Sequence, residues 1–123
     1  MSRPPLILAA LAALIGAAGV ALAAAAAHVH GGDLGRTAAL LLIIHAAAAL
    51  GVAAHARIAA APQRGLIAAG FVMEAGAAVF AADLATRAFT GERLLPYAAP
   101  IGGTTMILSW IGLATVFARA ARR

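Results

Sequence analysis

Four long apolar runs, separated by short polar breaks, take up nearly the whole of this sequence. The runs cover residues 5–27, 37–61, 65–89 and 100–119. A helix needs about 20 apolar residues to cross the hydrocarbon layer of a bilayer, so each run is long enough to span it. Helices satisfy their backbone hydrogen bonds internally, as lipid demands. The sequence therefore predicts an all-α, integral membrane bundle of four transmembrane helices with short loops.

The composition excludes a soluble protein. Hydrophobic residues make up 64% of the 123 residues and charged residues only 11%, where a soluble domain has about 25%. A chain of this length forms one domain, here residues 1–123, and the four runs leave no room for a separate catalytic domain. We expect no enzymatic activity. The chain has no cysteine, which excludes disulfides and thiolate metal sites.

The first run has features of a signal peptide, with Arg3 ahead of an apolar stretch and an alanine-rich end. Its apolar length of about 23 residues exceeds the 7–15 of a signal peptide, and Met1 is present. We therefore expect an uncleaved transmembrane helix.

The arginines predict the orientation of the bundle. They stand singly at the ends of the runs rather than in one patch, which argues against a nucleic-acid partner. Six lie on one side, against three on the other: Arg3, Arg57, Arg64, Arg119, Arg122 and Arg123 against Arg36, Arg87 and Arg93. The positive-inside rule then places both termini in the cytoplasm. Basic residues that are all arginine, with alanine as filler, are typical of a high-GC bacterium, so we expect a multi-pass protein of the bacterial inner membrane.

Two acids interrupt the third run. Asp83 precedes Arg87 by four residues, a spacing that predicts an ion pair on one helix face. Glu74 has no such neighbour in its own helix. If the second and third runs fold as a hairpin, His55 comes to the depth of Glu74 and His45 to that of Asp83. The two acids point about 180° apart on their helix, so only one of them can face the second run squarely, and the other should face the fourth run, a partner protein or lipid. A His–carboxylate pair inside a bilayer would relay protons or bind a cation, whereas the structural alternative for Glu74 is a neutral, hydrogen-bonded carboxyl that Ser109 or another subunit contacts.

A second candidate site lies in the first polar break. His28, His30 and Asp33 carry groups that bind zinc or copper, although a solvated loop that ends a helix is the simpler interpretation. Haem would need facing histidines on two helices, and only the second run has them at mid-membrane, so we predict no cofactor.

Small residues recur along every run and favour close packing of helices, either within the bundle or against another membrane protein. Gly102, Gly103 and Trp110 are the candidates for such an interface in the fourth run. Trp110 falls mid-span, where it packs inside the bundle or against a partner.

The sequence resembles the YgdD-like family of small membrane proteins, known as domain of unknown function 423. The resemblance rests on Ala27-His28 followed by two glycines, on His45 through Leu50, and on Pro100-Ile-Gly-Gly103 leading to Trp110. It implies an inner-membrane protein of about four helices with no established activity. Glu74 and Asp83, where the family has apolar or small residues, and His30 and Asp33 depart from the usual pattern.

These observations predict a structural or accessory subunit that docks on a larger membrane complex, with bioenergetic complexes as one example. Its partners would be lipids and other membrane subunits. The alternative is a small transporter or proton- and cation-handling protein that uses Glu74, His55, His45 and Asp83.

Overall fold

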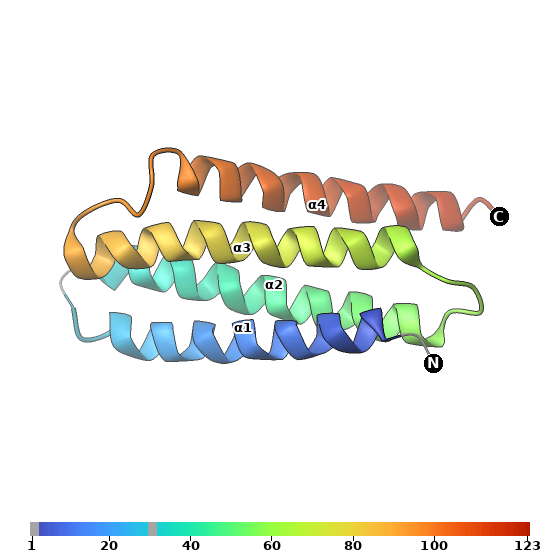
Figure 1. Cartoon of the computed structure of the whole chain (residues 1–123), viewed down its shortest axis with the longest axis horizontal. Helices are drawn as coiled ribbons and strands as arrows, with labels where there is room; N and C mark the ends of the chain where they lie inside the picture. The colour runs from blue at the N-terminus through green and yellow to red at the C-terminus, as the bar shows by residue number, and fades with distance from the viewer. Residues whose placement is uncertain (1–2, 30–31) are drawn as a thin grey trace.

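The computed structural model describes residues 3–29 and 32–123, and all regular structure within them is helical. The four helices are α1 (Pro4–Ala26), α2 (Gly32–Ile58), α3 (Arg64–Thr90) and α4 (Ala98–Ala120). They run side by side with alternating direction (Figure 1). Each is long and apolar enough to cross a membrane. The predicted all-α bundle of four membrane-spanning helices is confirmed.

The helix ends differ from the predicted boundaries chiefly at the start of α2. This helix begins at Gly32, whereas the second run was expected to begin at residue 37. Asp33 explains the extension, because its carboxylate lies in the first turn, where the helix dipole favours negative charge. Its Oδ1 also accepts a 2.6 Å hydrogen bond from Arg36. Most of the predicted polar loop is therefore the first turn of a helix.

Two residues with positive φ frame the connection between α3 and α4. Gly91 ends α3 at φ 78°, a left-handed conformation that glycine adopts without strain. Tyr97 precedes α4 at φ 67°, and Pro100 sits in the first turn, where its missing N–H costs no helical bond.

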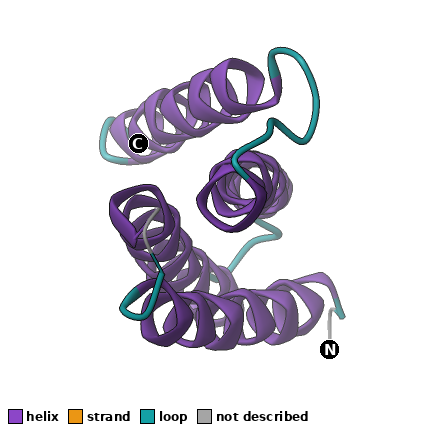
Figure 2. Ribbon diagram, turned by 90° about the vertical axis from the view of Figure 1, so that its left-hand side faces the viewer, coloured by secondary structure: helices purple, strands orange, loops and turns teal. Residues whose placement is uncertain are grey.

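The helix α3 is the centre of the bundle. It packs against α1, α2 and α4, whereas the α4 backbone packs closely against α3 alone among the described helices. Figure 2 shows that α1 and α4 are inclined to α3 rather than parallel to it. One end of the bundle carries Arg3, Arg57, Arg64, Arg119, Arg122 and Arg123, and we call it the Arg-rich end. The α1–α2 and α3–α4 connections lie at the opposite end.

Glycines permit the closest helix contacts. A Cβ on Gly102 of α4 would lie 2.6 Å from the backbone N of Phe80 and 2.7 Å from the carbonyl O of Gly76 in α3. Gly19 allows a close but looser contact between α1 and α2, since its Cβ would lie 2.8 Å from the side chain of Ile43 and 3.2 Å from the carbonyl O of Ala39. Gly103 is in ordinary contact range of the Phe80 ring. Small residues thus set the spacing of these helices.

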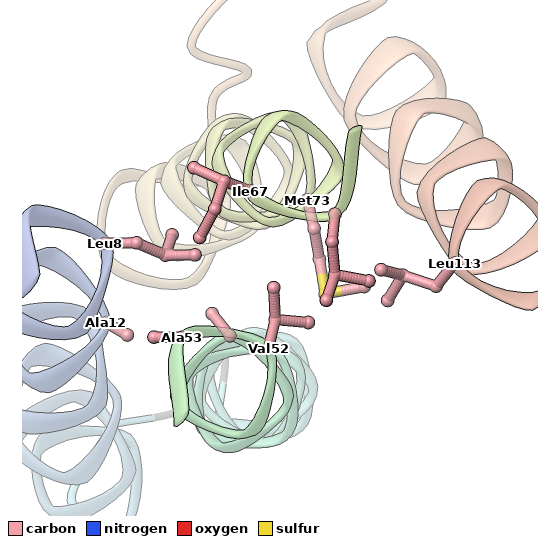
Figure 3. Packing of buried hydrophobic residues seen from close by; sticks show 9 residues of the cluster. Leu8, Ala12, Val52, Ala53, Ile67, Met73 and Leu113 are labelled. Atoms are coloured by element: carbon pink, nitrogen blue, oxygen red, sulfur yellow. The ribbon is translucent and has the colours of Figure 1, made fainter. Parts of the chain in front are cut away.

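The buried apolar side chains form two clusters. The first, nearer the Arg-rich end, joins all four helices (Figure 3). It consists of Leu8, Ala12, Ala49, Val52, Ala53, Leu66, Ile67, Met73 and Leu113. The second consists of Ala38, Leu42, Ala77, Ala81, Leu84, Ala99 and Met106. Along α3, the first cluster reaches Met73 and the second begins at Ala77, so Glu74 lies where the two meet.

Candidate functional site

Glu74 is the polar group whose position the packing does not explain. Its side chain is completely buried in α3, and neither Oε1 nor Oε2 has a hydrogen-bond partner among the described residues. A buried polar group that lacks a partner costs about 1–3 kcal/mol, so most are paired. Ionisable groups kept inside a membrane bundle despite such a cost are candidate functional groups.

The predicted pairing of Glu74 with His55 is wrong. His55 is exposed and its ring packs edge-on against Phe117 of α4, with 5.2 Å between the ring centroids. The hairpin register explains the error, because a Cβ on Gly70 would touch Val52. This contact puts Glu74 level with Ala48, about 10 Å along α2 from the level of His55.

Ser109, the other suggested partner of Glu74, bonds within its own helix. Its hydroxyl donates to the carbonyl O of Thr105 at 2.8 Å. Such a bond to the preceding turn is the usual state of a hydroxyl in a transmembrane helix.

His45 contacts Trp110 instead of Asp83. The indole N–H of Trp110 donates to His45 Nε2 at 3.2 Å, and the Nδ1 of His45 lies 2.6 Å from the carbonyl O of Leu41. These partners fit the neutral ring with its hydrogen on Nδ1, which donates to Leu41. Both ring nitrogens are therefore occupied. The predicted His45–Asp83 pair is a wrong prediction, and sequence spacing held no signal for the Trp110 contact.

Asp83 has partners at both of its carboxylate oxygens. Its buried carboxylate accepts a 2.5 Å hydrogen bond from Arg87 at Oδ2 and a 2.9 Å bond from the backbone N–H of Leu94 at Oδ1. The ion pair with Arg87 is present as the four-residue spacing predicted. The bond to Leu94 was not predicted, and it fastens the α3–α4 connection to the end of α3.

The predicted metal site at the α1–α2 connection gains no support. His30 lies outside the described residues, and Asp33 is exposed and paired with Arg36. Within residues 3–29 and 32–123, no three His, Cys, Asp or Glu side chains gather as a metal site would require.

Among the polar candidates that the structure describes, Glu74 therefore stands apart, since it alone is enclosed without a partner. Comparison with known proteins identifies the family of the chain. The sequence model of one protein family matches residues 15–103. The family is described as proteins of unknown function, DUF423. The chain belongs to the DUF423 family. No curated protein and no solved structure matches it.

The DUF423 match covers α2 and α3 completely, the second half of α1 and the start of α4 up to Gly103. Glu74, His45 and Asp83 fall inside it, together with Gly102 and Gly103. Trp110 falls outside. The resemblance to this family is confirmed, and the family itself has no assigned function.

Proposed function

We propose that this DUF423 protein is an accessory subunit of a larger complex in a bacterial inner membrane. Its four helices fill the chain, and the longest connection between them covers only residues 91–97. A protein built this way acts within the bilayer, where it contacts lipids and other transmembrane helices.

The observation that carries the proposal is a contrast between the outer faces of α1 and α4. The outer face of α4 carries large side chains that are more than half exposed: Ile101, Ile107, Leu108 and Ile111. Over residues 10–24, the outer face of α1 carries exposed alanines within about 80° of arc: Ala10, Ala13, Ala17, Ala21 and Ala24. Large exposed side chains border this stretch, with Leu14 and Val20 on either side and Leu6 on the same arc nearer the start of α1. Small residues let another helix approach closely, whereas large ones fill space against lipid tails. We infer that α1 faces a partner subunit and that α4 faces lipid.

Glu74 has no part in this contact, because its side chain is wholly enclosed by its own chain. A neighbouring subunit touches it only if the bundle opens.

The test compares one substitution at two exposed alanines. Ala17→Leu adds bulk to the outer face of α1, and Ala114→Leu adds the same bulk to α4. Tagged variants are purified in mild detergent from the native host, and co-purifying subunits are quantified by mass spectrometry. We expect Ala17→Leu to lower partner recovery at least tenfold and Ala114→Leu to leave it unchanged. Equal recovery with both variants, or a wild-type protein without any stoichiometric partner, would refute the proposal.

The arginine distribution supports an orientation with the Arg-rich end in the cytoplasm. Six of the nine arginines lie at that end, and the exposed Asp33 and Glu92 lie at the other. Positive residues are retained on the cytoplasmic side during insertion.

A second candidate function is proton or cation handling. One observation favours it, namely that the carboxyl of Glu74 is enclosed and has no hydrogen-bond partner among the described residues. The test is flux into liposomes that contain the wild type or Glu74→Gln. A flux that is present with the wild type and absent with Glu74→Gln, at unchanged helix content, supports this function. A wild type without flux refutes it.

A further inference from the structure

A cavity of about 630 Å³ lies at the Arg-rich end, between the start of α1, the end of α2 and the first two turns of α3. It is lined by Pro4, Pro5, Ala56, Pro62, Gln63, Arg64, Ile67, Ala68 and Phe71. The volume falls in the range of sites that bind small molecules, about 300–1,000 Å³.

The lining changes in character with depth. Arg64, the first residue of α3, is exposed at the mouth, and Gln63 beside it is engaged with the carbonyl O of Ala61. Phe71 lies about 10 Å further along α3, and the wall between Arg64 and Phe71 is apolar. A guanidinium at the mouth of an apolar cavity matches a ligand with an anionic head and a hydrocarbon tail.

The charge around the cavity favours an anion. The six arginines of this end have no acidic side chain near them, since Asp33, Asp83 and Glu92 lie toward the opposite end and Glu74 is enclosed mid-helix. Both ion pairs among the described residues involve arginines of the opposite end, Arg36 and Arg87. Arg64 is thus available to an outside partner, and a guanidinium binds phosphate oxygens in a forked geometry.

We propose that this cavity binds an anionic phospholipid of the surrounding membrane. The phosphate contacts Arg64, and the upper part of one acyl chain lies along Ile67, Ala68 and Phe71. The position supports a lipid, because Arg64 stands at the end of a span, where headgroups lie, and Phe71 lies within the hydrocarbon layer. The site is separate from the outer face of α1 that the accessory-subunit proposal uses.

Native mass spectrometry of the delipidated full chain tests the proposal. The protein is mixed with equal amounts of phosphatidylglycerol and phosphatidylcholine that carry the same acyl chains, and the lipid adducts are counted. We expect the wild type to retain phosphatidylglycerol preferentially. Arg64→Gln should lower that preference about fivefold, the effect of one surface arginine on an anionic lipid. Ala68→Trp should lower retention of both lipids, because the indole fills the cavity.

Arg119→Gln is the matched control, since Arg119 lies at the same end but does not line the cavity. Ala56→Leu narrows the cavity from α2 and replaces Ala68→Trp if that variant loses its helix content. The proposal is overturned if Arg64→Gln and Arg119→Gln behave alike, or if a folded narrowing variant retains lipid as the wild type does. Displacement of the lipid by equimolar glycerol phosphate would also overturn it, in favour of a soluble anion.

Discussion

The indole N–H of Trp110 in α4 donates a hydrogen bond to Nε2 of His45 in α2, at a distance of 3.2 Å. The backbones of these two helices are not in close contact. This bond and the His55–Phe117 ring contact connect α4 directly to α2. Because the α4 backbone packs closely on α3 alone among the described helices, these contacts, together with Leu113 in the first apolar cluster, oppose its rotation away from α2. The other nitrogen of His45 is held by Leu41, which orients the ring toward Trp110.

A double-mutant cycle measures this link. Trp110→Phe removes the donor, His45→Leu removes the acceptor, and the double variant removes both. Hydrogen bonds between transmembrane helices average about 0.6 kcal/mol in such cycles, and we expect a coupling of about 0.5–1.5 kcal/mol here. The measurement is unfolding in mixed micelles by increasing dodecyl sulfate. Strictly additive single changes would mean that the bond contributes nothing.

Gly102→Ala should destabilise the bundle by about 1–3 kcal/mol. The added methyl would meet backbone atoms of Phe80 and Gly76 at 2.6 and 2.7 Å, so α3 and α4 must move apart. Gly112→Ala is the control in the same helix, since its Cβ would meet nothing within 4 Å. Alanine should stabilise that position by about 0.5–1 kcal/mol, as in any helix interior. The same unfolding assay checks both variants, and equal effects would contradict the close contact.

Glu74→Met should stabilise the protein, by about 1–3 kcal/mol. The substitution replaces a carboxyl that has no hydrogen-bond partner with an apolar side chain of similar length. Glu74→Gln keeps a polar group in the same place and should gain less. A lower stability of Glu74→Met in the dodecyl sulfate titration would show that the carboxyl has a favourable partner. A gain in stability accompanied by loss of partner recovery or flux would mark Glu74 as a functional residue.

Asp83→Asn should release the α3–α4 connection. The change weakens both the pair with Arg87 and the bond from Leu94 N–H, and breaking a buried pair costs about 3 kcal/mol. We expect tryptic cleavage after the exposed Arg93 to become several-fold faster. Asp33→Asn is the control, because its pair with Arg36 is exposed and contributes less than about 1 kcal/mol. An unchanged cleavage rate in Asp83→Asn would show that Leu94 is held by other contacts.

Single cysteines test the orientation, since the chain has none of its own. Thr90→Cys lies at the opposite end and Ala121→Cys at the Arg-rich end, and both positions are exposed. A maleimide that cannot cross the membrane should label Thr90→Cys in intact cells and Ala121→Cys only after lysis. Labelling of Ala121→Cys in intact cells would reverse the predicted topology.

The sequence by itself determined the four helices and the Asp83–Arg87 pair. Both depend on local properties: the length of an apolar run decides whether a helix spans a bilayer, and a four-residue spacing brings two side chains onto one helix face. The start of α2 also depends on a local property, but the apolar pattern places it at residue 37 instead of Gly32. The pattern assigns Asp33 to a loop, whereas its carboxylate stabilises the first helical turn.

Only the tertiary structure decided which polar groups of different segments meet. The contacts of His45 with Trp110 and of Asp83 with Leu94, and the isolation of Glu74, depend on the relative height and rotation of the helices. Those quantities are set by contacts far apart in the chain, such as Gly102 on Gly76 and Gly70 facing Val52. The periodicity of a helix determines which residues share a face, but not how far a neighbouring helix is shifted along its axis. Residue spacing within one helix therefore could not predict these partners.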